Sequence, residues 1–159
     1  WFTNEENGLR GAKAFFEAHR DRVKDCVGAY ENDGGLEPPA GVDWSFAPSE
    51  RRGASRPAAG ADSRPAVDPT RVARARAITA LLEPLGAGAF GEGGGGADIG
   101  AFLAAGVPTL SPRTRGGRYF EWHHTEGDTV DKIDRDAFAR HVAAQAALFY
   151  VLADLRERL

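Results

Sequence analysis

The sequence predicts an α/β fold built around a mainly parallel sheet. Trp1–Asn4 is interpreted as the end of a strand that runs into a polar turn, and the short apolar run 26–30 has the composition of a buried strand. Between them, from Gly8 to about Lys24, apolar side chains recur at helical spacing with charged residues in between. A strand, a helix and a second strand joined by brief connections are typical of a βαβ unit, whose two strands are parallel.

Two longer helices are indicated in the second half of the chain. Asp68 and Pro69 begin one that ends before Pro84, because Asp is a preferred N-cap and proline is favoured at the first helical position. The other runs from Asp134 to about Leu155. Its helical spacing predicts that it buries these side chains: Phe138, Val142, Ala146, Phe149 and Leu152.

The glycine-rich segment 91–98 has the composition of a phosphate-binding loop but not its sequence. No lysine follows the glycines and no Gly-Lys-Ser/Thr sequence opens a helix, so nucleotide binding is not predicted. Instead, Asp98 is predicted to cap a short helix over 99–105, followed by a strand over 107–110. Residues 113–129 are expected to form a polar and aromatic loop.

Residues 36–67 interrupt the alternation of helices and strands. The stretch is rich in Pro, Gly, Ala, Ser and Arg with little periodicity, so we expect a long, flexible insertion. Between Arg51 and Arg76 the sequence has seven arginines and two aspartates, a local charge of +5. A solvated basic loop is the interpretation we favour. Binding of RNA or another anion is the alternative, although no aromatic residue lies between the arginines to stack on bases.

Length and composition favour one domain. The chain has 159 residues, 42% of them hydrophobic, and 20 Lys and Arg against 23 Asp and Glu give a net charge of −3. This charge gives no general attraction to nucleic acid or anionic membranes, and no apolar run approaches the roughly 20 residues of a membrane span. The single cysteine, Cys26, excludes an internal disulfide and is predicted to be a buried, unreactive thiol.

Three polar clusters lie at predicted strand ends or in the loops that follow them: Glu5-Glu6, Glu31-Asn32-Asp33, and His123-His124 with Asp128. In open α/β sheets the crevice beyond the carboxyl ends of the strands is the usual ligand site, where distant residues converge. Imidazole and carboxylate are the donors of catalytic zinc sites, and of two adjacent glutamates one can bind a metal while the other faces the bound water. Each cluster alone is typical of a solvated loop, but together they supply the donors of a zinc site.

These segments, in this order, resemble the di-zinc aminopeptidases, and most of all their carboxypeptidase Q (plasma glutamate carboxypeptidase) branch. The resemblance is carried by Thr3–Gly11, Glu31–Gly34, Gly96–Ile99, Gly106–Pro108 and His123–Thr129. It extends nearly end to end, except for the insertion. It implies a three-layer α-β-α fold with a mainly parallel, mixed sheet. Because the chain begins at Trp1, inside what reads as a core strand, we expect residues 1–159 to be the C-terminal part of one zinc-peptidase catalytic domain.

The resemblance implies a role for each matched residue. Glu5 corresponds to the general base and Glu6 to a ligand of one of two zinc ions. Asp33 corresponds to a ligand of the other zinc. His124 corresponds to the histidine ligand of the zinc that Glu6 does not bind, and His123 would be its neighbour rather than a ligand.

The implied activity is that of a metalloprotease of the exopeptidase class, an aminopeptidase or dipeptidase acting on short peptides. Asp98 and Tyr119 would line the substrate side. The general base would deprotonate a zinc-bridging water, which attacks the peptide carbonyl, and would then pass the proton to the leaving amine. The resemblance also implies a secreted or periplasmic location and a possible homodimer.

The family pattern includes two further elements before the glutamate pair, a His-x-Asp motif and a metal-bridging aspartate. The four residues that precede Glu5 hold neither. We therefore expect this chain alone to bind zinc weakly and to hydrolyse little, the activity residing in a longer protein. His19 and His141 fall on predicted helices and are interpreted as surface residues.

A non-catalytic binding module on the same fold is the main alternative. The joint presence of Glu5, Glu6, Asp33 and His124 argues against it, because a module without catalysis has no need of all four. An anion-binding protein that uses the arginine-rich stretch would leave the acidic clusters unexplained.

Overall fold

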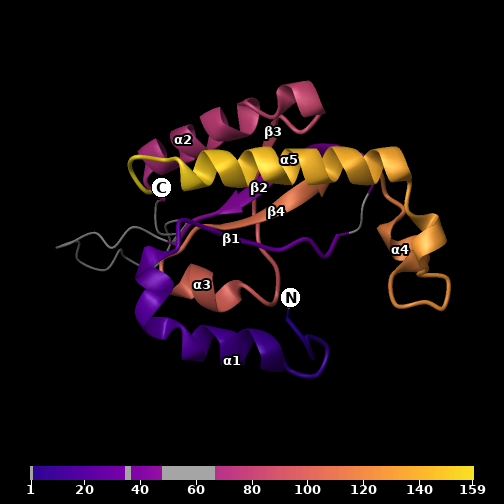
Figure 1. Cartoon of the computed structure of the whole chain (residues 1–159), viewed down its shortest axis with the longest axis horizontal. Coiled ribbons are helices and arrows are strands. Elements are labelled where there is room, and N and C mark those ends of the chain that lie inside the picture. The colour runs from indigo at the N-terminus through magenta and orange to yellow at the C-terminus, as the bar shows by residue number, and fades with distance from the viewer. Residues whose placement is uncertain (1, 35–36, 48–66) are drawn as a thin grey trace, which may run out of the picture.

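A four-stranded mixed sheet forms the centre of the molecule (Figure 1). The structure is a computed structural model and describes residues 2–34, 37–47 and 67–159. In the order β1-β4-β2-β3, the strands are β1 (Ala29–Tyr30), β4 (Thr109–Thr114), β2 (Pro39–Ser45) and β3 (Ala89–Glu92). β1 is parallel to β4 and β2 to β3, whereas β2 and β4 are antiparallel. The predicted α/β class with a mixed sheet is confirmed.

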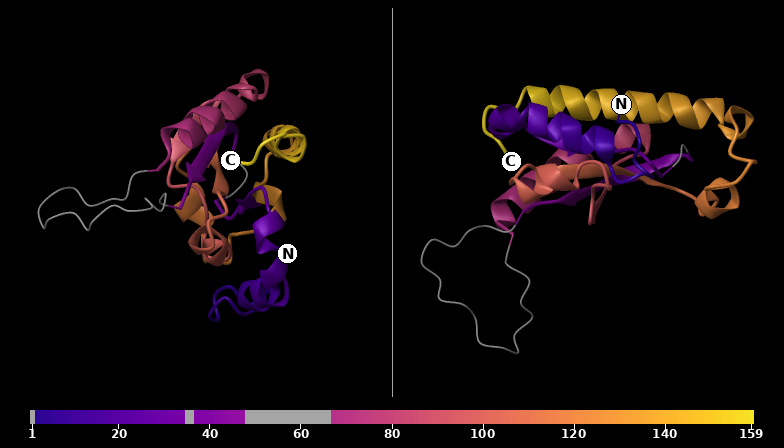
Figure 2. Two further views of the ribbon diagram at one scale, coloured as in Figure 1. Left: turned by 90° about the vertical axis from the view of Figure 1, so that its left-hand side faces the viewer. Right: turned by 90° about the horizontal axis from the view of Figure 1, so that it is seen from below.

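Helices lie on both sides of the strands. The α-helices are α1 (Arg10–Ala18), α2 (Pro69–Ala80), α3 (Gly100–Ala104), α4 (Tyr119–Trp122) and α5 (Arg135–Ala153), and the 3₁₀ turns are η1 (Arg20–Asp25), η2 (Glu83–Leu85) and η3 (Val130–Lys132). Figures 1 and 2 show α2 and α5 on one side of the sheet and α1 and α3 on the other. The arrangement is helix, sheet, helix. Within the described ranges, no helix is long and apolar enough to cross a membrane.

Both of the longer helices begin where the sequence places them. The Asp68 side chain accepts a hydrogen bond from Thr70 N at 2.8 Å, and Pro69 follows as the first residue of α2. At the start of α5, Asp134 Oδ1 accepts from Ala137 N at 2.7 Å. These side chains satisfy backbone donors that no helical carbonyl can reach.

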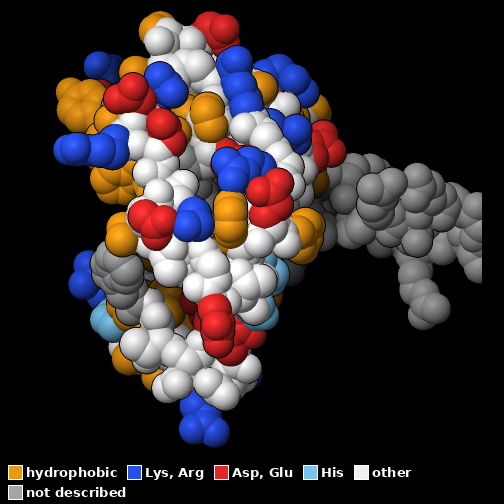
Figure 3. All heavy atoms as spheres, turned by 90° about the vertical axis from the view of Figure 1, so that its right-hand side faces the viewer, with side chains coloured by type: hydrophobic (Ala, Val, Ile, Leu, Met, Phe, Trp, Pro, Cys, Tyr) orange, Lys and Arg blue, Asp and Glu red, His pale blue; other side chains and the backbone are white. Residues whose placement is uncertain are grey.

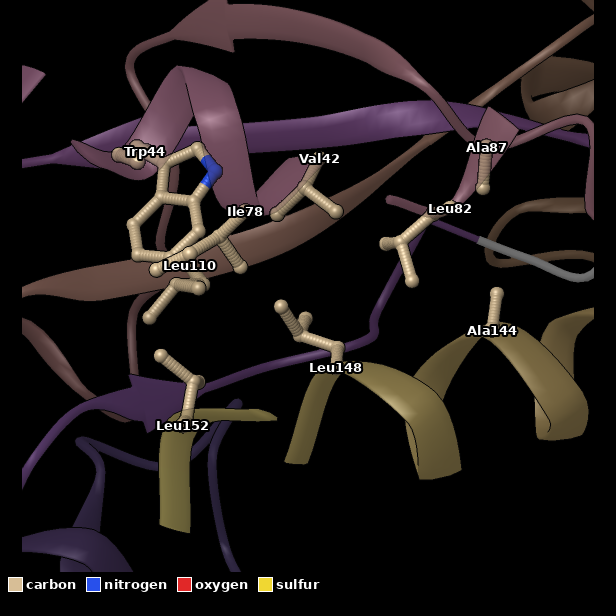
Figure 4. Packing of buried hydrophobic residues seen from close by; sticks show 10 residues of the cluster. Val42, Trp44, Ile78, Leu82, Ala87, Leu110, Ala144, Leu148 and Leu152 are labelled. Atoms are coloured by element: carbon tan, nitrogen blue, oxygen red, sulfur yellow. The ribbon is translucent and has the colours of Figure 1, made fainter. Parts of the chain in front are cut away.

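The main core lies between the sheet and the helices α2 and α5. Figure 4 shows side chains of β2 and β4 meeting those of both helices, and the buried residues are Val42, Trp44, Ala75, Ile78, Leu82, Ala87, Leu110, Ala144, Leu148 and Leu152. Trp44 is 1% exposed, and its indole N–H donates to Thr79 Oγ1 at 2.9 Å. The Thr79 hydroxyl in turn donates to Ala75 O at 2.9 Å, so the polar atoms inside this core are paired.

A second, smaller core joins α1, η1 and α3 to the sheet. Its buried members are Val23, Ile99, Phe102 and Val107, with Phe2, Phe16, Cys26 and Ala29 packed against them. Cys26 is only partly buried, which corrects the prediction of a buried thiol. The reason is that the strand expected over 26–30 is limited to Ala29–Tyr30, so Cys26 lies in the turn after η1.

Two strands lie where none was predicted. β2 falls inside the segment expected to be an insertion, and β3 falls in the glycine-rich region. Val42 and Trp44 are buried and Asp43 between them is not, which is the period of a strand. Gly41 lets β3 approach, since a Cβ there would lie 1.7 Å from Ala89 O. The rest of the expected insertion, 48–66, lies outside the described residues, as do the arginines within it.

Other boundaries also differ from the prediction. The helix expected from Gly8 to about Lys24 divides into α1 and η1, and β4 extends to Thr114, beyond the expected end at residue 110. Residues 2–4 are not in a strand, and Trp1 lies outside the described residues.

The face of α5 that packs on the sheet differs from the predicted one. Phe138, Val142 and Phe149 are between 44% and 49% exposed, and of the predicted set only Leu152 is fully buried. The helix instead buries a second stripe with spacings of three and four residues: Ala137, His141, Ala144, Leu148 and Leu152. The polar ring of His141 can lie on this buried stripe because its Nε2 donates to the carbonyl oxygen of Glu37.

Removing the Thr79 hydroxyl is predicted to destabilise the fold. Thr79→Val leaves the Trp44 N–H without an acceptor in a dry core, which should lower the free energy of unfolding by about 1–3 kcal/mol. Thr79→Ser keeps the hydroxyl and is the control; it should lose only about 0.8 kcal/mol for the buried methyl. Urea denaturation followed by tryptophan fluorescence measures both. A smaller loss for Thr79→Val than for Thr79→Ser would show that the hydrogen bond is unimportant.

Candidate active site

Glu6 and His124 are in direct contact although 118 residues separate them in the sequence. His124 Nε2–H donates to Glu6 Oε1 at 2.7 Å, and both side chains are more than half exposed. Two of the three predicted metal ligands therefore meet at the surface. Figure 3 looks onto the α4 end of the molecule, where acidic side chains lie close to histidines, among interspersed basic and hydrophobic groups.

The glutamate pair lies in a tight turn that leads into α1. Asn4 has φ of 59°, and Gly8 N and Leu9 N both donate to Glu5 O, at 3.2 and 3.0 Å. The turn folds back onto the first turn of α1, where Gly11 leaves no room for a Cβ: one would lie 2.5 Å from Thr3 N. The turn thus holds the side chains of Glu5 and Glu6 at the start of the helix.

His124 occupies a left-handed backbone position directly after α4, with φ of 57°. The chain beyond it is closed by local hydrogen bonds: Thr125 Oγ1 donates to Trp122 O at 2.7 Å, and Asp128 N donates to Thr125 O at 3.1 Å. Positive φ values are uncommon for residues other than glycine and require support from the surrounding structure. Such residues are found frequently at functional sites.

The contacting pair opens onto a cavity of about 800 Å³. Its wall includes residues from all three clusters, namely Glu6, Asp33, His123, His124 and Asp128, and also the candidate Tyr119. The predicted site residues Glu5 and Asp98 do not line it. Basic and aromatic groups complete the wall, among them Arg115, Arg118, Trp122 and Lys132. Folding therefore gathers the three sequence clusters around one cavity of the size of a small-ligand site.

Carboxylates of the cavity wall act on the neighbouring Glu5, although Arg115, Arg118 and Lys132 also lie on this wall. Partial burial raises the pKa of Glu5, and the negative charges of Glu6, Asp98 and Asp33 raise it further, while His124 opposes them. The pKa of Tyr119 is also raised, by desolvation first and then by neighbouring carboxylates, chiefly that of Asp33. The Tyr119 phenol therefore keeps its proton and is available as a hydrogen-bond donor.

Asp98 does not cap a helix, contrary to the prediction. The N-cap of α3 is Ile99, and α3 has no side-chain cap. Asp98 Oδ1 is buried and has no hydrogen-bond partner among the described residues. The backbone N–H of Ile99 donates instead to Glu31 Oε2 at 3.2 Å. Glu31 therefore accepts the hydrogen bond that Asp98 was expected to accept. The Glu31 carboxylate also lies close to Gly96: a Cβ on Gly96 would be 1.9 Å from Glu31 Oε1.

Glu37 and His141 are structural residues of the site that the sequence interpretation missed. His141 is 2% exposed, not a surface residue as predicted, and its Nε2 donates to Glu37 O. This hydrogen bond allows the polar ring to be buried. The Glu37 carboxylate accepts from Arg118 N at 3.2 Å. The burial of His141 could have been predicted from its helical spacing to Ala137, Ala144 and Leu148. Nothing in the sequence around Glu37 indicates its role.

The predicted ligands do not form a complete metal cage. In the part of the chain that the structure describes, no three His, Cys, Asp or Glu side chains are close enough together to hold a metal ion. Asp33 shares the cavity with Glu6 and His124 but does not close a three-ligand set with them. His19 is followed by Asp21, the spacing of a His-x-Asp motif, yet its ring stacks on Phe15 and its Nδ1 lies 2.8 Å from Phe15 O.

Comparison with known proteins identifies the family. The model of peptidase family M28 matches residues 1–149. The chain belongs to peptidase family M28. Among curated proteins it is 29% identical to carboxypeptidase Q of Mus musculus and 27% identical to that of Homo sapiens, each over 158 residues. These alignments cover 99% of this chain and 29% of each relative.

A solved M28 structure has the same fold. The crystal structure of a peptidase M28 precursor from Shewanella amazonensis SB2B superposes with a TM-score of 0.75 and 31% sequence identity, covering 99% of this chain and 31% of that one. The expected relationship to the carboxypeptidase Q branch is thus confirmed. The chain spans less than a third of the length of the M28 proteins that it matches.

Neutralising Glu31 is predicted to stabilise this M28 chain at neutral pH. Burial raises the pKa of Glu31, and the Asp98 and Asp33 charges add to the shift while the Ile99 N–H opposes it. A raised pKa means that the folded state binds the proton more tightly than the unfolded state. The ionised carboxylate therefore lowers stability as the pH rises from about 4.3, the ordinary value for glutamate. Glu31→Gln keeps an acceptor for Ile99 N and removes this cost.

Thermal melts at pH 4 and pH 7 measure the effect. Glu31→Gln should melt higher than the unsubstituted chain at pH 7, and the difference should shrink at pH 4. The exposed Glu126 provides the control, since Glu126→Gln should change neither melt. A lower melting temperature for Glu31→Gln at pH 7 would show that the charge stabilises the site.

Proposed function

We propose that this chain is the C-terminal part of the catalytic domain of a zinc-dependent metallo-exopeptidase that hydrolyses short peptides, as an aminopeptidase or dipeptidase. The supporting observation is the Glu6–His124 contact on the wall of a carboxylate-rich cavity. An exposed ion pair adds only about 0–1 kcal/mol to the stability of the fold. Stability alone therefore does not explain why the turn with Glu6 and the loop with His124 are in contact. Metal binding gives a reason for this contact, and membership of family M28 supports a peptidase.

The donors around the cavity fit zinc. Imidazole nitrogen and carboxylate oxygen are its ordinary ligands, and Glu6 and His124 already approach each other as two ligands of one ion would. We therefore assign Glu6 and His124 to the same zinc and Asp33 to the second. This revises the expected division, in which His124 and Glu6 bound different ions. When bound, the metals would polarise the substrate carbonyl and stabilise its developing negative charge.

Glu5 is proposed to move the proton. It is adjacent in sequence to the proposed ligand Glu6, and of two adjacent glutamates one can bind a metal while the other faces the attacking water. In the proposed reaction Glu5 takes a proton from the attacking water and gives it to the leaving amine. The Tyr119 phenol, which keeps its proton, and Asp98 are assigned to the substrate side.

The cavity wall carries charges of both signs that suit the two ends of a short peptide. Asp128, which is not assigned to zinc, would attract the ammonium group of the N-terminus, and Arg115, Arg118 and Lys132 would attract a carboxylate. A secreted or periplasmic location and a homodimeric state belong to the same proposal and are drawn from the family resemblance. Two ligands expected from the family have no counterpart before Glu5, so this chain alone should bind zinc weakly and hydrolyse little.

Substitution of each adjacent glutamate by glutamine tests the division of roles. In the longer protein that the proposal implies, Glu5→Gln should retain zinc and lose about 10²–10⁴-fold in turnover of a dipeptide, the range for a general base. Glu6→Gln should lose zinc as well as turnover, because it removes a ligand. Zinc content by mass spectrometry of the purified protein and dipeptide hydrolysis are the two measurements.

Each alternative gives a different result. If Glu5→Gln lost zinc and Glu6→Gln kept it, the two roles are exchanged. If neither the unsubstituted protein nor its variants held zinc or cleaved dipeptides, the chain would be a binding module on the M28 fold and the proposed function would be wrong.

A further inference from the structure

Three aromatic rings form a continuous stack beside the Glu6–His124 contact. The rings of Tyr119 and His123 are stacked with centroids 4.5 Å apart and an interplanar angle of 26°. The His123 and His124 rings are stacked at 3.9 Å and 23°. Phe120 meets the edge of both Tyr119 and His123, at 4.9 and 6.0 Å. His124 is thus the last ring of a layered cluster that begins in α4.

The stack is built by one helical turn. His123 is the C-cap residue of α4, and its N–H donates to Tyr119 O at 2.9 Å, which places the two residues on the same side, one helical turn apart. The chain then turns into the left-handed region at His124, which brings the next ring back over His123.

The His124 ring needs such support because little else holds it. Its side chain is 60% exposed, and Glu6, its polar partner, is 67% exposed. Exposed side chains rotate freely, and ordering one on binding a ligand costs conformational entropy. A ring already held flat against another loses less of this freedom.

The structure assigns His123 a positioning role: its ring, stacked between Tyr119 and His124, holds the His124 imidazole toward Glu6. This goes beyond the expectation that His123 is merely a neighbour of a ligand. The orientation itself is a property of the folded chain; its value for metal binding rests on the proposed function, in which His124 is a ligand. His123 acts through its ring plane, since no described carboxylate lies within 4.0 Å of its nitrogens, whereas His124 has Glu6.

Two substitutions separate the ring plane from the imidazole nitrogens. His123→Ala removes the stacking surface, and His123→Phe keeps a flat aromatic ring without nitrogens. His19→Ala is the matched control, because His19 is a second histidine stacked on an aromatic ring, Phe15, at 4.2 Å, and it does not line the cavity. Thermal melts of all variants verify that they fold.

The first readout needs no metal. In aromatic ¹H–¹³C spectra of the chain, the ring protons of His124 should be shifted upfield by the neighbouring ring. His123→Ala should move these signals downfield and raise the mobility of the His124 ring, whereas His123→Phe should preserve both. His19→Ala should change neither. Unchanged His124 signals in His123→Ala would overturn the stack.

The second readout is the dissociation constant for zinc alone, measured by competition with a chromophoric chelator. His123→Ala should weaken binding about 10-fold, the low end for residues that orient a metal ligand, and His123→Phe should stay close to the unsubstituted chain. His124→Ala separates the two proposals. If His124→Ala weakens zinc binding and His123→Ala does not, the positioning role is wrong while the metal role stands. If His124→Ala binds zinc as tightly as the unsubstituted chain, the proposed metal-binding role of His124 is wrong. The ¹H–¹³C spectra then test whether His123 orients the His124 ring.

Discussion

The contact between the Glu6 carboxylate and the His124 imidazole is the constraint on which the rest of the site depends. It joins the turn before α1 to the loop after α4, segments that no ladder of backbone hydrogen bonds connects. For the contact to form, α1 must pack onto α3 through the small core, and the chain that leaves β4 must lead into α4 near the start of α1. The exposed pair contributes little stability of its own, so the position of both ends is determined by packing elsewhere.

Glu37 links the parts of the fold that surround this contact. Its carbonyl accepts from His141 inside α5, and its carboxylate accepts from the backbone N–H of Arg118 at the start of α4. Gly116 allows this approach, because a Cβ there would lie 2.0 Å from Glu37 Oε2. One residue thus connects the long helix, the loop that leads to His124, and the entry to β2. The buried His141 does not line the cavity and is connected to it only through Glu37.

The sequence predicted the parts of the fold whose signals are local. The α/β class, the starts of α2 and α5 at Asp68 and Asp134, and the relationship to the M28 peptidases could all be read from it. β2 and β3 could not, because prolines and glycines hide their short alternating patterns, and whether Gly41 marks a loop or a close approach depends on the partner strand. The two apolar stripes of α5 could not be distinguished by their spacing, because both recur every three or four residues and one of them contains the polar His141.

The candidate site shows the same division. The three clusters were found from residue type and order, and folding brings them to one cavity. The contact between Glu6 and His124 was not predicted: the two were expected to bind different zinc ions, and the His124 imidazole lies against the Glu6 carboxylate. Nor did the sequence indicate that Glu31, rather than Asp98, would satisfy the Ile99 N–H. Pairings of this kind depend on how separate loops approach each other, which spacing along one chain does not encode.

A double-mutant cycle on Glu6 and His124 tests the central claim most directly. Zinc dissociation constants are measured for the chain, for Glu6→Gln, for His124→Ala and for the double variant. If both residues hold one ion, each single substitution removes most of the binding and the double variant binds little worse than either, so the free-energy changes are strongly non-additive. Changes that add within about 0.3–0.5 kcal/mol would place the two residues on independent sites and contradict the account.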